Sequence, residues 1–141
     1  MSIEDRLKLY AEIESARARP LIVYVTSIRI NASGQIGPDV TPFFIKQLQE
    51  IPDTETEVDV LIVSNGGDGI VPWRLISMLR ERFTKVGVLL PYVAYSAATL
   101  FALGADEIIM HPYSNLGPVD PQLTVPSQDG QRQIQFPADD I

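Results

Sequence analysis

The 141-residue chain contains no cysteine, which excludes disulfide bonds, thiolate metal sites and a cysteine nucleophile. Positive charge is also scarce, because 11 lysines and arginines stand against 18 acidic residues, for a net charge of −7. Nucleic acids and anionic membranes are bound through basic patches, so this balance argues against both as partners. The first residues show a charged helical pattern and no signal peptide, and we therefore expect a cytoplasmic protein.

Long hydrophobic runs are scarce as well, and the one that stands out covers residues 86–105 without a charged side chain. Gly87, Pro91 and two tyrosines interrupt this run, which indicates a strand, a loop and a buried helix rather than a transmembrane span. The overall content of 45% hydrophobic and 21% charged residues is ordinary for one globular domain with a real core.

The rest of the chain alternates strand patterns with helix patterns. Short strands separated by single helices predict an α/β fold with a mainly parallel sheet and repeated β-α units, with a site at the carboxyl ends of the strands. Residues 1–20 are predicted to form an amphipathic helix that packs on the domain or on a neighbour, residues 27–38 a loop or hairpin, and residues 124–141 an irregular tail. Strands are expected near residues 21–28, 58–63, 86–90 and 107–110, and helices near residues 41–50, 71–83 and 96–103.

Ser96 is a candidate nucleophile, because it stands among small residues at a strand-to-helix transition in the run PYVAYSAATLFALGAD. It lies at the first turn of the predicted helix, where free backbone N–H groups and the positive end of the helix dipole gather. An oxyanion that forms beside this serine would find hydrogen-bond donors there. A serine in the same place also serves as an ordinary N-cap, so this stretch alone leaves both roles open.

A second turn, NGGDG at residues 65–69, follows one strand pattern and precedes a helix pattern. Glycines at the end of a strand let the backbone approach a ligand with its N–H groups pointing outward, which suits an oxyanion hole as well as a phosphate. The turn is not a Walker motif, since no Gly-Lys-Ser/Thr follows, and it lacks the G-x-G-x-x-G spacing of a dinucleotide site. A tight structural turn and a functional loop are both open.

Together the two segments resemble the Clp-type serine peptidase superfamily, and most closely the serine dehydrogenase proteinase family, a cousin of signal peptide peptidase A. Gly66 and Gly67 fall where these peptidases keep a glycine pair, and YSAAT at residues 95–99 falls where the nucleophile heads a helix. The runs ALGADEIIM and SNLGPVDPQ are similar to two further elements of the family. The resemblance implies a Clp/crotonase-like domain over residues 21–123 and a serine peptidase that needs no cofactor.

The resemblance also implies roles for particular residues and partners. Ser96 would attack a peptide carbonyl, while the turn at Gly66 and Gly67 and the N–H of Ala97 hold the oxyanion. Asp120 falls close to where Clp peptidases place their histidine, which implies that it orients a base; a carboxylate in PVDP equally caps a local turn. The expected partners are peptide or protein substrates, membrane proteins among them, and further copies of the chain, because members of the superfamily assemble into rings or stacked oligomers.

The chain departs from the family pattern at the position before the glycine pair and in its supply of a base. Asn65 stands where relatives usually carry proline, and Lys85 is the last lysine, which excludes a Ser–Lys dyad of the usual order. His111, the only histidine, precedes Asp120 and so stands in the wrong order for a Ser-Asp-His triad. We expect the base to be His111, a residue of a partner subunit, or a residue beyond the C-terminus of a truncated chain, and the irregular tail favours truncation.

Two other functions fit the same residues. A catalytically silent fragment or scaffold would keep the fold and the oligomer contacts, and the absence of a base in the usual order favours it. A crotonase-type acyl-CoA binder shares the fold and holds a thioester oxyanion with backbone N–H groups, although it does not need a serine at the helix start. Trp73 and Phe101 are candidates for oligomer contacts, with core packing as the expected role of each.

Overall fold

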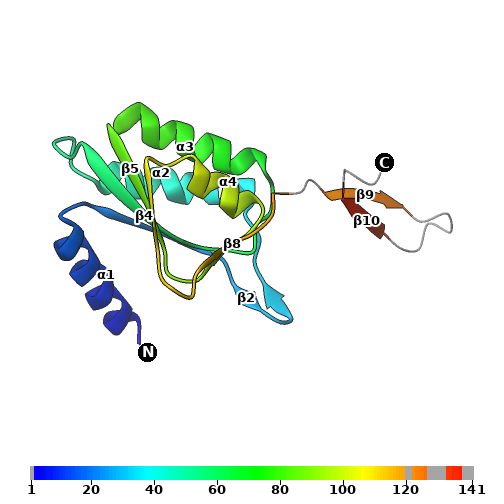
Figure 1. The fold of residues 1–141 in the computed structure, drawn as a ribbon. Helices are drawn as coiled ribbons and strands as arrows, with labels where there is room; N and C mark the ends of the chain where they lie inside the picture. Colours follow the sequence, from blue (N-terminus) through cyan, green and yellow to red (C-terminus); the bar gives the residue numbers. More distant parts are fainter. Residues whose placement is uncertain (1, 120–121, 127–132, 138–141) are drawn as a thin grey trace.

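The computed structural model describes residues 2–119, 122–126 and 133–137, and it confirms the α/β fold with a mainly parallel sheet. Four parallel strands lie in the order β1-β4-β5-β7; helices α2, α3 and α4 cover one face, and α1 lies against the other (Figure 1). The elements are α1 (Ile3–Arg17), β1 (Leu21–Val25), β2 (Ile28–Arg29), β3 (Ala32–Ser33), η1 (Pro38–Val40), α2 (Thr41–Glu50), β4 (Glu57–Val63), α3 (Ile70–Arg82), β5 (Lys85–Leu90), β6 (Val93–Ala94), α4 (Ala97–Leu103), β7 (Glu107–Met110), β8 (Asn115–Leu116), β9 (Gln122–Pro126) and β10 (Gln133–Pro137).

The two central strands, β4 and β5, have neighbours on both sides and are covered on both faces. Their sequences are therefore nearly continuous apolar runs rather than alternating ones. Val60 of β4 lies opposite Ile22 of β1 and Val88 of β5 in the parallel register. Because β4 and β5 are parallel, their carboxyl ends lie at the same edge of the sheet.

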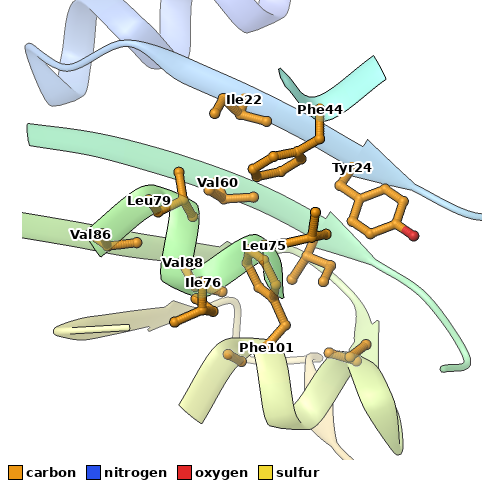
Figure 2. Packing of buried hydrophobic residues seen from close by; sticks show 14 of the residues in the cluster. Ile22, Tyr24, Phe44, Val60, Leu75, Ile76, Leu79, Val86, Val88 and Phe101 are labelled. Atoms are coloured by element: carbon orange, nitrogen blue, oxygen red, sulfur yellow. The ribbon is translucent and has the colours of Figure 1, made fainter. Parts of the chain in front are cut away.

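The hydrophobic core fills the space between the sheet and the three crossover helices. Phe44 of α2 and Phe101 of α4 meet edge to face, with ring centroids 6.5 Å apart and an interplanar angle of 77°. Figure 2 shows both rings with Leu75 and Leu79 of α3 against the side chains of the strands. Phe101 is thus a core residue, as expected, and its helix is fixed to the sheet by this packing.

Trp73 does not have the core role that we expected. Its side chain is 75% exposed on α3, and it borders a hollow of about 540 Å³ between α3 and α4. Leu100 and Leu103 of α4 line the same hollow, so α4 buries only the face that carries Phe101. The stretch expected to be wholly buried therefore presents one apolar side to solvent.

The N-terminal helix α1 forms as predicted and begins with a capping box. The Asp5 N–H donates to the Ser2 hydroxyl (3.1 Å), and the Ser2 N–H donates to the Asp5 carboxylate (2.8 Å). None of its fifteen described residues is buried, so only the last turns reach the sheet. There Ile13 lies beside Leu61 and Leu89 at a hollow of about 450 Å³. Of the two expected modes, packing on the domain thus involves the end of the helix, and packing on a neighbour stays a prediction.

The hairpin region at residues 27–38 and the C-terminal tail compare differently with their predictions. Residues 27–38 contain the short hairpin of β2 and β3, one of the two expected forms. In the described residues of the tail that we expected to be irregular, β9 and β10 instead pair antiparallel. The sequences QLTV and QIQF alternate polar and apolar residues with the period of a strand, a signal that the surrounding prolines and glutamines conceal. None of the described helices combines the length and apolar character that spanning a bilayer requires.

Candidate active site

The two turns singled out in the sequence meet at the carboxyl edge of the sheet. Gly66 has φ +103°, a conformation that favours glycine, and its backbone packs directly on the turn that carries Ser96. A Cβ atom on Gly66 would lie 2.6 Å from the Tyr95 carbonyl oxygen, 2.8 Å from Ser96 Cβ and 3.2 Å from the Ala97 nitrogen. Only glycine permits this approach, so the glycine turn and the serine turn form one unit.

Ser96 has the backbone of a strained turn rather than that of an ordinary N-cap. Its φ of +51° and ψ of −118° fall in a region that residues with a Cβ rarely adopt, at a cost of about 1–3 kcal/mol. Its side chain makes no capping hydrogen bond within the described chain, although it directly precedes α4. The hydroxyl, which is half-buried, is therefore not committed to the capping role that the sequence left open.

The backbone N–H groups beside Ser96 divide into bonded and available ones. Gly66 N–H donates to the Ser64 hydroxyl (3.1 Å), and the Ser96 N–H donates to the Pro118 carbonyl (3.1 Å). Ala97 opens α4, where an N–H has no intrahelical acceptor. At Gly67, the bridge to Ile36 uses the Gly66 carbonyl and the Asp68 N–H, and the Gly67 N–H takes no part in it. Gly67 and Ala97 thus supply the available donors among the predicted site residues.

The segment that leads toward Asp120 is bound to the serine turn. Besides the bond from Ser96 to Pro118, the Gly117 N–H donates to the Ala94 carbonyl (3.0 Å). The Thr99 hydroxyl bridges the two strands, bonding the Ala94 carbonyl (2.7 Å) and the Gly117 carbonyl (3.0 Å). Asp120 itself lies outside the described residues, two positions after Pro118 in the sequence.

His111 lies at the end of β7, on the side of the sheet that faces α1. It is exposed, and its Nδ1 accepts a hydrogen bond from the Tyr113 N–H (3.2 Å), which leaves the ring proton on Nε2 in the neutral form. It lines the hollow shared with Ile13 and Met110, and none of the described residues around that hollow belongs to the glycine turn or to α4. The structure therefore does not group His111 with Ser96.

Charged side chains gather at the opposite, amino edge of the sheet. Arg17 Nε donates to the Asp59 carboxylate (2.7 Å) and its Nη2 to Glu107 (2.6 Å), while Arg19 also bonds both carboxylates. The hydrogen bond from Arg19 is the main reason that the pKa of Glu107 falls to about 2. No group of three or more His, Asp or Glu side chains among the described residues is arranged to hold a metal ion.

Comparisons with known proteins agree with this geometry. Residues 28–130 match the family of ClpP-like SDH-type serine proteinases. The uncharacterised proteins MJ1495 and MJ0137 of Methanocaldococcus jannaschii are each 32% identical to the chain, over 86% and 84% of its length. The chain spans 43% of the length of each of these relatives.

Two solved structures of a membrane-bound stomatin-specific protease, 1510-N, share the fold. A serine-to-alanine mutant superposes with a TM-score of 0.55 at 24% identity and covers 85% of this chain and 57% of that one. A lysine-to-alanine mutant in complex with a substrate peptide gives a TM-score of 0.54 at 25% identity, over 85% and 54% of the two chains. The fold is that of the ClpP-like proteases. The chain belongs to the family of ClpP-like SDH-type serine proteinases.

Sequence reasoning overlooked one buried polar residue at this edge. Ser64 directly follows β4 and has no exposed surface, and its hydroxyl bonds both Gly66 and Thr26. The available signal was a serine between a strand and a glycine pair, since a polar residue at the buried end of an apolar strand needs a partner.

Proposed function

We propose that the chain carries the nucleophilic half of a serine peptidase site, with Ser96 as the nucleophile. The observation that carries the proposal is the close packing of Gly66 on a Ser96 turn with positive φ and an uncommitted hydroxyl. A sharp, strained turn between a strand and a helix is how other hydrolases present a serine oxygen to a carbonyl. Membership of a serine proteinase family supports the same reading of the turn.

The Gly67 and Ala97 N–H groups are proposed as the oxyanion donors. They come from the two turns that Gly66 holds together, and neither takes part in the bonds that occupy their neighbours Gly66 and Ser96. When the Ser96 oxygen adds to a peptide carbonyl, charge develops on the carbonyl oxygen, and two fixed donors stabilise it without reorganising. The Gly66 N–H, which we also predicted as part of the oxyanion hole, donates to the Ser64 hydroxyl. We propose that it stabilises the turn and does not bind the oxyanion.

The serine proton needs an acceptor, and we propose a group outside the described residues, supplied by this subunit or by a second copy. His111 lines a hollow on the α1 side of the sheet, apart from the serine turn. Asp120 remains our proposed carboxylate for orienting that base, because the preceding segment is hydrogen-bonded to Ser96. A His111→Gln variant is expected to react at the parental rate, and loss of reactivity would assign the base to His111.

Peptide or protein substrates are the class that the family supports, and we propose that this chain acts on peptide segments. The structural neighbour is described as membrane-bound and stomatin-specific, and its mutant is bound to a substrate peptide. We propose that this chain likewise binds an extended peptide, and that membrane proteins are among the sources of such peptides.

We also propose that the chain forms a homo-oligomer. Trp73, Leu100 and Leu103 are exposed together at the hollow between α3 and α4, and a contiguous apolar surface of this kind is typical of a protein–protein contact. Sedimentation velocity over a range of concentrations tests this, and a monomer at every concentration would reject it.

The first test of the proposed function is intact-mass analysis after treatment with a fluorophosphonate. An activated serine oxygen forms an O–P bond and displaces fluoride, which leaves with the serine proton as HF, so one adduct adds the probe mass less HF. We expect a single adduct on the parent chain, none on Ser96→Ala, and the parental adduct on Ser77→Ala, which removes an exposed hydroxyl from α3. An unlabelled parent would favour the silent scaffold, and an adduct retained by Ser96→Ala would place the nucleophile elsewhere.

A further inference from the structure

Ser64 links the two halves of the candidate site. It is fully buried directly after β4, one residue before the turn that contains Gly66 and Gly67. Its backbone N–H donates to the Val93 carbonyl (3.0 Å), and its carbonyl accepts from the Tyr95 N–H (3.0 Å). These bonds form the isolated bridge to Ala94 and fix the strand that delivers Ser96.

The Ser64 side chain holds the other turn. Its oxygen accepts the Gly66 N–H (3.1 Å), and it is also hydrogen-bonded to the Thr26 hydroxyl (2.8 Å) just beyond β1. Gly66 is itself buried, so without this acceptor its N–H would have to find another partner, and the adjoining peptide would turn. The peptide unit that this hydrogen bond holds joins Asn65 to Gly66. The next unit joins Gly66 to Gly67 and carries the Gly67 N–H, the proposed oxyanion donor, so the two units share the Gly66 Cα atom.

We propose that Ser64 is a positioning residue: its backbone sets the approach to Ser96, and its hydroxyl holds the peptide before Gly66 and thereby the position from which the Gly67 N–H projects. The inference rests on the proposed function, because the donor matters only if an oxyanion forms there. Ser64 would not touch the substrate. Its hydroxyl acts through the Asn65–Gly66 peptide, which leads into the one that carries the Gly67 N–H. Small misplacements of such donors lower reaction rates strongly.

The test compares fluorophosphonate labelling rates of Ser64→Ala and Ser114→Ala, measured well below the melting temperature of each variant. Ser114 is a matched control, because it is also buried and its hydroxyl also makes a local hydrogen bond to the backbone, here by donating to the His111 carbonyl (2.7 Å). We expect Ser64→Ala to label about tenfold more slowly than the parent, and Ser114→Ala to label within about twofold of it. With a cleavable peptide, Ser64→Ala should lower kcat and leave KM unchanged, because the donor acts on the developing oxyanion.

Two further measurements separate positioning from loss of stability. Ser64→Thr restores the hydroxyl and should recover most of the labelling rate. In ¹H–¹⁵N spectra, the Gly66 and Gly67 amides should shift in Ser64→Ala and stay in place in Ser114→Ala.

The outcomes distinguish the inference from the function on which it rests. A labelled parent together with Ser64→Ala at the parental rate would overturn the role of Ser64 and leave Ser96 as the nucleophile. Equal slowing in Ser64→Ala and Ser114→Ala would also overturn it, since the effect would then be general. A parent that cannot be labelled would reject the proposed function, and the role of Ser64 with it.

Discussion

The two edges of the sheet are built by different means. At the carboxyl edge, Gly66 and Ser96 have positive φ, and the contacts that join their turns are neutral hydrogen bonds, mainly between backbone groups. At the amino edge, charged side chains make the contacts, with Asp59 only 1% exposed between Arg17 and Arg19. Shape is fixed by the main chain at one edge and by charge at the other.

This division separates reactivity from anchoring. Backbone donors keep their direction without a titrating partner, which suits a site that must hold an oxyanion. Ion pairs tolerate movement and respond to pH, which suits the attachment of the end of α1 to the sheet. Changes at the amino edge should therefore alter stability alone, and changes at the carboxyl edge should alter reactivity first.

The largest effect is expected from Gly66→Ala. The new methyl group would lie less than 3 Å from atoms of Tyr95 and Ser96, and the positive φ adds strain. We therefore expect the free energy of unfolding to fall by about 3 kcal/mol and fluorophosphonate labelling to be lost. Gly69→Ala is the control, because its Cβ would meet only Leu100, at 3.7 Å, and the change should cost at most about 1 kcal/mol. Urea denaturation and intact-mass analysis measure both variants; equal behaviour would contradict the close packing of the two turns.

The next largest effect is expected from Asp59→Ala at the other edge. Removing this buried carboxylate leaves the guanidinium groups of Arg17 and Arg19 without one of their partners. The free energy of unfolding falls by about 3–5 kcal/mol when such a pair is broken at a fully buried site. We expect about 2–3 kcal/mol here, because the arginines are partly exposed. The folded variant should label at Ser96 at the parental rate. A labelling rate that falls with stability would show that the two edges are coupled.

A smaller effect is expected on acidification. The pKa of Glu107 lies near 2 in the folded chain and its ordinary value is 4.5, so its ion pairs stabilise the fold above about pH 4.5, and this contribution is lost as the pH falls toward 2. Glu107→Gln should be less stable than the parent at pH 6, and the difference should shrink between pH 4.5 and 2. A difference that stays constant over this interval, in denaturant titrations at each pH, would contradict the assignment.

The smallest effect is expected from Arg80→Gln. The Arg80 guanidinium donates two hydrogen bonds to the Gly104 carbonyl (3.0 and 2.8 Å) at the C-terminus of α4. Because this side chain is about half exposed, we expect a loss of only about 0.5–1 kcal/mol, with unchanged labelling. Thermal unfolding measures the change, and a loss above about 2 kcal/mol would mean that α4 depends on this cap more than on the packing of Phe101.

Much of the fold could be predicted from the sequence, because its signals are local. Continuous apolar runs predicted β4 and β5. Pro91 marked the end of β5, and Gly104 marked the end of α4. The pairing of Gly66 with Ser96 came from a resemblance, since periodicity alone cannot say which turns of a parallel sheet meet. The role of Ser64 needed atomic distances, because one serine hydroxyl that accepts a buried N–H looks like any other in the sequence.

Other features escaped prediction because they depend on what surrounds an element. Trp73, Leu100 and Leu103 are apolar and were expected inside, but the described chain leaves their side of α3 and α4 uncovered. Arg17 and Arg19 stand at the end of a charged helical pattern. Their pairing with Asp59 and Glu107 joins residues some forty to ninety positions apart, which no local pattern reveals.

The exposed indole of Trp73 gives the chain a built-in optical reporter. It is the only tryptophan among the 141 residues, so all tryptophan emission arises from the hollow between α3 and α4. An indole in contact with water emits at longer wavelength than one surrounded by apolar groups. A peptide or a second subunit that covers this hollow will therefore shift the emission maximum of the unlabelled protein to shorter wavelength. The two cases differ in whether the shift depends on peptide concentration or on protein concentration.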